Sequence, residues 1–127
     1  MNNINKLSAN NKLFIEKFET AESSGKTLQE LGINREVYWA YERSTEAGNE
    51  LINFYDIIDE EDAEDIIKCC RENDVKAFTI SSNSTGMIRV IMALEAQGCH
   101  LNGTAMVNRD NLRIDAKQIP AFKIEIL

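Results

Sequence analysis

The first fifty residues place their hydrophobic positions at helical spacing and show no alternation typical of a strand. Apolar side chains recur every three or four residues over 12–24, and Gly25 ends that pattern, as glycine does after many helices. A second helical stretch is predicted over 27–48, with an interruption at Gly32. We therefore expect a helical N-terminal region over residues 1–50.

From residue 51 onward the spacing changes, and short apolar runs alternate with amphipathic stretches. The predicted elements are a strand at 51–55, a helix at 59–73, a strand at 77–81, a helix that ends before Gly98, and strands at 100–108 and 118–127. The order β-α-β-α-β-β predicts a βαβ crossover closed by an antiparallel hairpin. The expected fold is of the α+β or α/β class, a small mixed sheet with helices packed on it.

The last two strands are expected to differ in their faces. Lys123 and Glu125 alternate with apolar residues, which predicts that one face of the final strand is wet,. Pro120 cannot donate to a ladder, so it should lie near the start of an edge strand,. In the strand before it, Leu101, Gly103, Ala105 and Val107 are expected on one face because side chains alternate along a strand,.

The change of period at residue 51 suggests a boundary. We expect residues 51–127 to form the α/β core and residues 1–50 to be separable from it, although a single globular unit is also consistent with a chain of 127 residues,. No apolar run approaches the roughly 18 residues of a membrane span, and the Asn-rich start lacks the features of a secretory signal,. These observations predict a soluble, cytoplasmic protein.

The net charge of −7 arises mainly in the middle of the chain, where residues 51–80 hold nine acids and three bases. Such a surface disfavours nonspecific binding of nucleic acid, which depends on Lys and Arg neutralising phosphates. The three cysteines are odd in number, and two of them, Cys69 and Cys70, are adjacent. They suggest reduced thiols rather than a disulfide framework or a zinc finger, and we expect no metal and no cofactor.

A dense group of carboxylates precedes and begins the helix predicted at 59–73; we call it the acidic strip, and it comprises Asp59, Glu60, Glu61, Asp62, Glu64 and Asp65. One interpretation is a solvated face whose first turn suits the helix dipole. The other is a surface that binds a basic protein or imitates the phosphates of a nucleic acid. Arg109 and Arg113, in the polar connection at 109–117 that should project from the sheet, form a second candidate partner surface.

The polar turn after the second predicted strand is a candidate anion site, because it precedes a helix whose N-terminal amides could bind phosphate. Its residues are Ser81, Ser82, Ser84, Thr85 and Gly86. It matches neither the P-loop nor the GxGxxG pattern, and Ser and Thr are also ordinary helix caps. Both interpretations stay open, the second being purely structural.

Catalysis and sequence-specific DNA binding find less support. The single histidine, His100, follows Cys99 directly, and adjacent residues of a strand point to opposite faces,. We therefore expect no catalytic residues. Residues 27–46 superficially resemble a helix-turn-helix, with 35–44 as the recognition helix, but acids outnumber bases there,. The aromatic side chains Tyr38, Trp39 and Tyr41 are expected to pack on the sheet.

Four segments from residue 49 to the end stand out, namely 49–54, 78–82 with 84–86, 95–99 with Gly103, and 119–126. They resemble a family of small uncharacterised proteins found on plasmids, conjugative elements and phages of low-GC Gram-positive bacteria. The resemblance covers about three-fifths of the chain. It implies an accessory protein of a mobile element and transfers no catalytic motif.

These observations together favour a non-catalytic interaction protein that occupies the surface of a protein partner, for example a host-defence component such as a CRISPR effector. A homodimer is compatible with the same sequence. The alternatives are a small-ligand or nucleotide-binding domain that uses the Ser81–Gly86 turn, and a DNA-binding regulator that uses residues 27–46.

Overall fold

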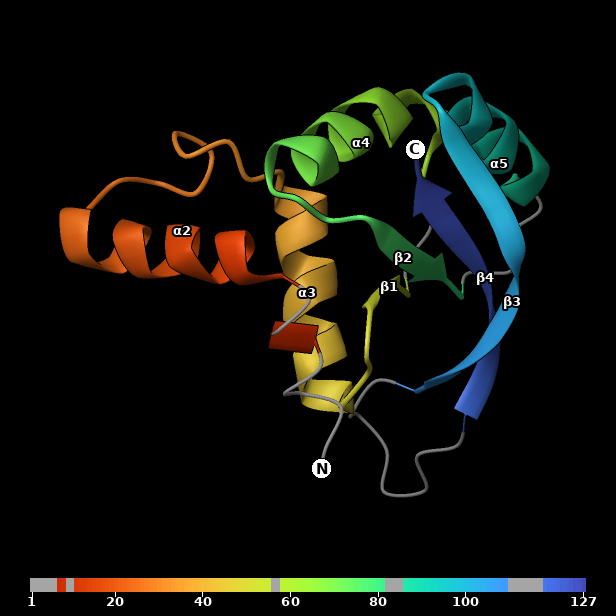
Figure 1. The fold of residues 1–127 in the computed structure, drawn as a ribbon, viewed down its shortest axis with the longest axis horizontal. Helices are drawn as coiled ribbons and strands as arrows, with labels where there is room; N and C mark the ends of the chain where they lie inside the picture. The colour runs from red at the N-terminus through yellow and green to blue at the C-terminus, as the bar shows by residue number, and fades with distance from the viewer. Residues whose placement is uncertain (1–6, 9–10, 56–57, 82–85, 110–117) are drawn as a thin grey trace.

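The computed structural model describes residues 7–8, 11–55, 58–81, 86–109 and 118–127 (Figure 1). Its elements are α2 (Lys12–Ser24), α3 (Arg35–Ala47), β1 (Ile52–Phe54), the 3-10 turn η1 (Glu60–Asp62), α4 (Ala63–Glu72), β2 (Ala77–Ile80), α5 (Met87–Ala96), β3 (Cys99–Asn108) and β4 (Gln118–Ile126). From β1 onward this is the predicted order β-α-β-α-β-β. Four helices and a mixed sheet in the described residues make the fold α+β.

The four strands lie in the order β1-β2-β4-β3. β1 and β2 are parallel, whereas β4 runs antiparallel to both of its neighbours, β2 and β3. The last strand is thus inserted between two strands that precede it. In Figure 1, α4 and α5 lie together at one end of the sheet, and α3 runs alongside β1.

One face of the sheet forms the floor of the hydrophobic core. The register sets Ile52 beside Phe78 and Phe78 beside Ile124, and all three side chains are fully buried or nearly so. Ile66 of α4 and Leu94 of α5 belong to the same cluster. Burying side chains of this size contributes about 1.5–3 kcal/mol each, so this face and the helices above it are the main source of stability.

Helix α3 closes the outer edge of β1. The Ser44 hydroxyl accepts a hydrogen bond from the Asn53 N–H (2.8 Å) and donates to the Asn53 carbonyl oxygen (3.4 Å). Both backbone groups belong to β1, which is an edge strand of the described sheet. Val37 and Ala40 of α3 are buried in the common core. The core therefore crosses residue 50, the boundary that the change of period suggests.

The segment from Thr27 to Gly32 forms a single turn and not the predicted first part of a helix. The Thr27 hydroxyl accepts from the Glu30 N–H, and the Glu30 carboxylate accepts from the Thr27 N–H, which is a capping box,. Two residues later Gly32 (φ 82°) and Ile33 close a Schellman motif, with Ile33 N–H donating to Leu28 O,. Start and stop signals lie so close together that only one turn fits between them.

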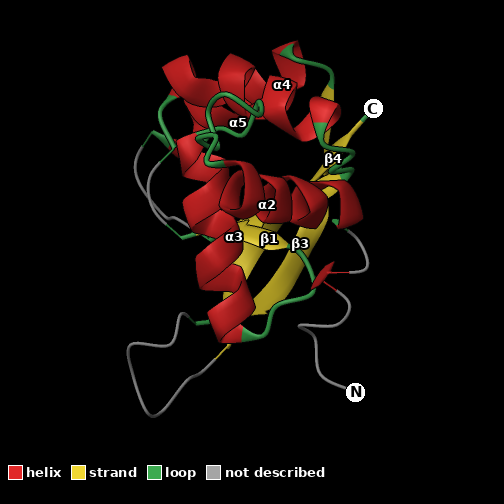
Figure 2. Cartoon of the chain, turned by 90° about the vertical axis from the view of Figure 1, so that its left-hand side faces the viewer, coloured by secondary structure: helices red, strands yellow, loops and turns green. Residues whose placement is uncertain are grey.

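The aromatic residues of α3 pack on α2 rather than on the sheet, contrary to expectation. Tyr41 lies 5.2 Å from the Phe14 ring and Tyr38 lies 5.1 Å from the Phe18 ring, centroid to centroid. Figure 2, seen from the side of α2, shows α2 lying across α3 with the sheet behind both. Trp39 stays 48% exposed. A separate aromatic layer thus joins α2 to α3.

The prediction that Pro120 lies in an edge strand is wrong, because β4 is an inner strand. Ile126 N–H donates to Lys76 O beside β2, so alternate residues of β4, Pro120 among them, direct their backbone nitrogen toward β2,. The last residue of β2 with a partner on β4 is Ile80, opposite Phe122. Pro120 therefore lies beyond the end of β2, where its missing N–H costs no ladder bond.

The strand β3 is interrupted by a bulge, so the expected single face for Leu101, Gly103, Ala105 and Val107 is also wrong. Leu101 is opposite Ile124 and Thr104 is opposite Phe122, which gives β3 one extra residue. Gly103 adopts φ 73° at this point, a conformation that glycine allows without steric cost,. After the bulge the alternation of faces is inverted relative to a regular strand.

A polar clasp joins the end of α3 to the end of β3. The Asn49 side-chain oxygen accepts from the Asn108 N–H (2.8 Å), and the Asn108 side chain donates to Ala47 O (3.0 Å). Tyr55 donates its hydroxyl to Asn108 O. These bonds give the asparagine at position 49 a structural role.

Candidate functional site

The acidic strip lies on a short frame whose apolar residues are buried. Asp59 is extended, η1 follows, and α4 then begins at Ala63. Ala63, Ile66 and Ile67 face the core, so the intervening carboxylates are directed outward by the helical period,. The side chains of Asp59, Glu60, Glu61, Glu64 and Asp65 are exposed, and Asp62 is half-buried. The structure therefore places all six predicted residues on one continuous surface segment.

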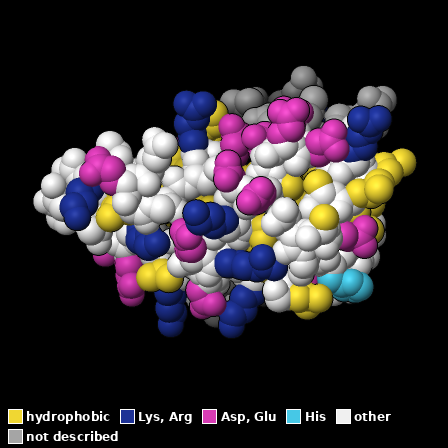
Figure 3. Space-filling view, turned by 90° about the horizontal axis from the view of Figure 1, so that it is seen from above, with side chains coloured by type: hydrophobic (Ala, Val, Ile, Leu, Met, Phe, Trp, Pro, Cys, Tyr) yellow, Lys and Arg dark blue, Asp and Glu magenta, His cyan; other side chains and the backbone are white. Residues whose placement is uncertain are grey.

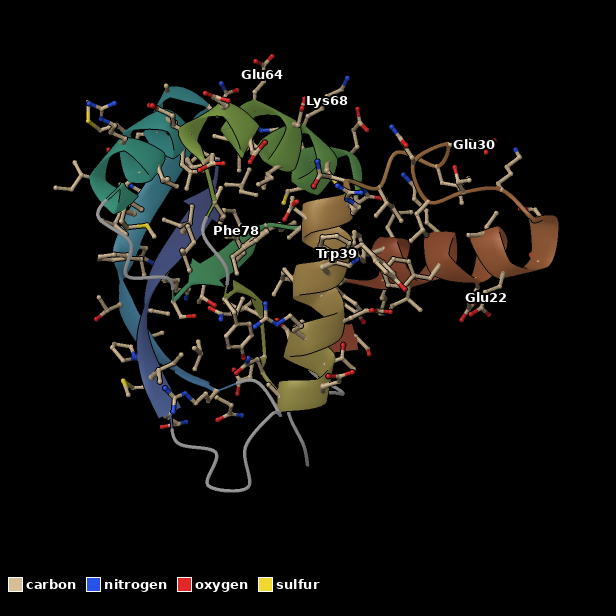
Figure 4. All side chains as sticks on the ribbon, turned by 180° about the vertical axis from the view of Figure 1, so that it is seen from behind. Glu22, Glu30, Trp39, Glu64, Lys68 and Phe78 are labelled. Atoms are coloured by element: carbon tan, nitrogen blue, oxygen red, sulfur yellow. The ribbon has the colours of Figure 1, made fainter. Side chains whose placement is uncertain are left out.

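Little positive charge opposes these carboxylates. Within the described chain, one ion pair reaches the strip, between Arg89 of α5 and Glu60 at 3.7 Å, and both side chains are largely exposed. Such exposed pairs contribute about 0–1 kcal/mol. Figure 4 shows Glu64 and Lys68 pointing outward from α4, side by side along the helix. The helix dipole favours acids in this first turn, so the strip is compatible with the fold without needing a partner.

Figure 3, which looks down on α4 and α5, shows several Asp and Glu side chains close together near one margin of this face. Lys and Arg side chains stand at both ends of this group, and elsewhere on the face the two signs are interspersed. A group of like charges raises the local potential and attracts a basic surface at distances up to a Debye length, about 8 Å at physiological salt.

The candidate anion turn is described only at its two ends, since 82–85 lie outside the described residues. Ser81 N–H donates to Phe54 O (3.1 Å), and the Ser81 hydroxyl oxygen accepts from the Asn53 side chain (3.0 Å). The same asparagine accepts a bond from the Thr79 hydroxyl (2.7 Å). These polar groups of Ser81 are therefore engaged in joining β1 to β2. Gly86 occupies the N-cap position of α5.

Cys99 and His100 lie apart on the two faces of β3. Cys99 is buried and His100 is exposed, and burial raises the pKa of the Cys99 thiol although Arg71 opposes this. Burial also raises the pKa of Cys69 and of Cys70. Thiols in this state are poor nucleophiles at neutral pH. Among the described residues there is no group of three or more His, Cys, Asp or Glu that could hold a metal ion.

The candidate recognition helix is α3, and its inner face is occupied by the core. Its outer side includes Arg35, Trp39, Glu42 and Glu46. The Arg35 guanidinium stacks on the Trp39 ring at 4.9 Å. Two carboxylates on the exposed side would face the phosphates of a duplex, which is unfavourable for a reading helix.

Sequence patterns gave no indication of a groove between the turn at 28–34 and α4. Its volume is about 830 Å³, and its lining includes Tyr38, Trp39, Arg35 and Lys68. Trp39, which the sequence analysis expected to pack on the sheet, lines this groove instead and stays partly exposed. Charges of both signs line the groove, so its shape and polarity alone select no ligand.

The second candidate partner surface is only partly described. Arg109 is exposed directly after β3, whereas Arg113 lies outside the described residues. The acidic strip is consequently the one predicted partner surface whose residues the structure describes in full.

None of the described helices is long and apolar enough to cross a membrane.

These features define a small α+β protein with a four-stranded mixed sheet, buried thiols and an exposed acidic strip. The chain belongs to a family described as a domain of unknown function, DUF7698, whose model matches residues 36–126. The match starts in the first turn of α3 and ends on the last residue of β4. No curated protein and no solved structure matches the chain.

Proposed function

We propose that this chain is a non-catalytic interaction protein of a mobile genetic element, acting in the cytoplasm by occupying a basic surface of a protein partner. The observation behind the proposal is the acidic strip, with five of its six carboxylates exposed and a single described counter-ion, Arg89. The mobile-element setting rests on the segments that resemble proteins of plasmids, conjugative elements and phages. A nucleic-acid-binding component of host defence, such as a CRISPR effector, has the basic surface that this strip would fit.

Three properties of the strip support binding. Its carboxylates are solvated, so a partner cation can reach them without a conformational change. Its frame is fixed by Ala63, Ile66 and Ile67 in the core, so little order must be gained on binding. Its charge has the same sign as the net charge of −7, so attraction of a basic partner acts over the whole approach.

The test starts with affinity purification of the full chain and its partner from the native host. We then compare two variants with the same change of net charge. The strip variant contains Glu60→Gln, Glu61→Gln, Glu64→Gln and Asp65→Asn. The control variant neutralises four exposed glutamates elsewhere, namely Glu16, Glu19, Glu46 and Glu95.

We expect the strip variant to associate with the basic partner about tenfold more slowly at low salt, while the control variant changes much less. The difference should shrink as salt is added, because screening weakens exposed charges first. Equal rates for the strip variant and the unmodified chain would remove the strip from the mechanism. Recovery of a bound nucleotide or of DNA in place of a basic protein would favour the two other function classes.

A further inference from the structure

The two edges of the sheet are treated differently. At β1 the outer edge is covered by α3, and the Ser44 hydroxyl binds the backbone of Asn53. At the other edge, β3 has β4 on one side, and no described strand lies on its other side. With ten residues β3 is also the longest described strand. An uncovered strand of this length is a template for pairing with another chain.

The backbone groups available at this edge follow from the ladder. Leu127 N–H donates to Gly98 O, and in an antiparallel pair alternate residues bond to opposite sides. The residues that direct N–H and C=O outward are therefore Cys99 and Leu101 before the bulge and Thr104 and Met106 after it. Asn108 has the same orientation, and its N–H is already bound by Asn49. The free edge thus runs from Cys99 to Met106.

The side chains of β3 itself are uncharged and partly apolar. β3 contains no Lys, Arg, Asp or Glu, although 28% of the chain is charged. Three of the large hydrophobic side chains left exposed lie on β3 and on α5, which packs against it: Ile88 (75%), Met92 (63%) and Met106 (56%). Figure 1 shows α5 and β3 on the same side of the molecule. Large exposed apolar residues on neighbouring elements are typical of interaction sites.

We propose that this edge pairs with β3 of a second copy of the chain, antiparallel about a two-fold axis, with the two α5 helices flanking the pair. The charge distribution favours a second copy of the chain as the partner of this edge. Two copies with a net charge of −7 repel each other, and a strand without charge is where they can approach with the least repulsion. Antiparallel pairing of identical strands is self-complementary, as a two-fold interface requires.

The covered edge at β1 determines the size of the assembly. Among the described strands each chain offers one free edge, so pairing two copies uses the free edge of each and leaves none for a third. The result is a closed dimer with a continuous sheet and not a filament. The acidic strip lies on η1 and α4, so this inference is independent of the proposed function, and either can fail without the other.

The experiment measures the mass of the full chain by light scattering and sedimentation at physiological salt over a wide concentration range. We expect twice the monomer mass for the unmodified chain and the monomer mass for Met92→Glu. The matched control is Leu13→Glu, a substitution of the same kind at a partly exposed residue of α2, which should stay dimeric. A monomer at all concentrations would overturn the proposal, as would a Met92→Glu variant that remains dimeric.

Hydrogen exchange then tests the pairing itself. The outward amides of Leu101 and Thr104 should exchange at least tenfold faster in the monomeric Met92→Glu variant than in the dimer, since only the dimer satisfies them. The inward amides of His100 and Ala105, which bond to β4, serve as the internal control and should change little. A dimer in which Leu101 and Thr104 exchange as fast as in the monomer would exclude β3 pairing.

Discussion

The hydroxyl group of Ser44 binds the outer backbone groups of β1, on the side where no described strand pairs with it. It satisfies one N–H and one C=O at the sheet edge, at 2.8 and 3.4 Å, and is itself fully buried. Buried backbone groups without partners cost about 1–3 kcal/mol each. A serine in a helix is ordinarily a neutral surface residue, so its importance follows from its location and not from its type.

Replacing Ser44 by Ala should lower the free energy of unfolding by about 1–3 kcal/mol, because it leaves the buried Asn53 groups without a partner. The control is Ser23→Ala on α2, where an exposed hydroxyl bonds to the carbonyl oxygen of Thr20 and water can replace it. Urea denaturation of both variants measures the difference. Equal stability of the two variants would mean that water reaches Asn53.

The buried thiols make stability depend on alkaline pH. Burial raises the pKa of Cys70 in the folded protein above the ordinary value of 9.0. Below that value the thiol is protonated in both states and its contribution to stability is complete. Above it the unfolded chain loses the proton while the folded chain keeps it, so the free energy of unfolding falls as pH rises. The slope from one such thiol is about 1.4 kcal/mol per pH unit.

We therefore expect denaturation under reducing conditions to show a clear loss of stability between about pH 9 and about pH 11. A Cys70→Ala variant, although less stable at all pH values because of the cavity, should lose less over the same range. If the two proteins decline in parallel, other groups cause the pH dependence. Burial also raises the pKa of Cys69 and of Cys99, and the hydrogen bond with Glu42 raises the pKa of Tyr38, so these groups add to the same loss of stability.

At the scale of elements, the sequence predicted the helices and strands that depend mainly on interactions between residues close together in the chain. The period of the apolar residues predicted α2, α4, β2 and the alternation along β4, since each depends on neighbours within a few positions. The position of β4 between β2 and β3 could not be predicted, because it depends on contacts between residues far apart in the chain. For that reason the sequence analysis assigned Pro120 to an edge strand, although β4 is an inner strand. The single turn at Thr27–Gly32 could have been predicted from its start and stop signals.

The two N-terminal helices differ in their relation to the sheet. α2 contacts α3 through aromatic rings, whereas α3 packs directly on β1. The family match begins at residue 36 and so includes α3 but not α2. This packing changes the expectation that residues 51–127 fold alone, since their core would lack Val37 and Ala40.

We expect a chain that starts at Asn34 to unfold cooperatively, as followed by circular dichroism, because it retains α3 and the clasp at Asn49. A chain that starts at Asn49 should be unfolded or aggregated, because it exposes the edge of β1 and the buried side chains beneath α3. The two shortened chains differ by one helix only. A cooperative transition in the shorter chain would show that residues 1–50 are separable after all.

At the scale of the whole molecule, the acidic strip could be predicted from the sequence, whereas the surfaces assembled from distant segments could not. The acidic strip is local in sequence, so its exposure followed from the helical period of α4. The groove beside Trp39 and the uncovered edge of β3 are assembled from distant segments, so no local pattern indicates them. The middle of the predicted anion turn, residues 82–85, and Arg113 lie outside the residues that the structure describes, so both sites remain predictions.

The bulge in β3 also bears on how this fold could change over generations. Leu101 and Thr104 face residues of β4 that are two positions apart, so an in-frame loss of the Gly103 codon would leave both pairings in place. The strand would straighten, and everything downstream would keep its position. A lineage could therefore gain or lose the bend at this edge in one genetic step, and with it alter how readily two copies meet, without first passing through an unfolded ancestor.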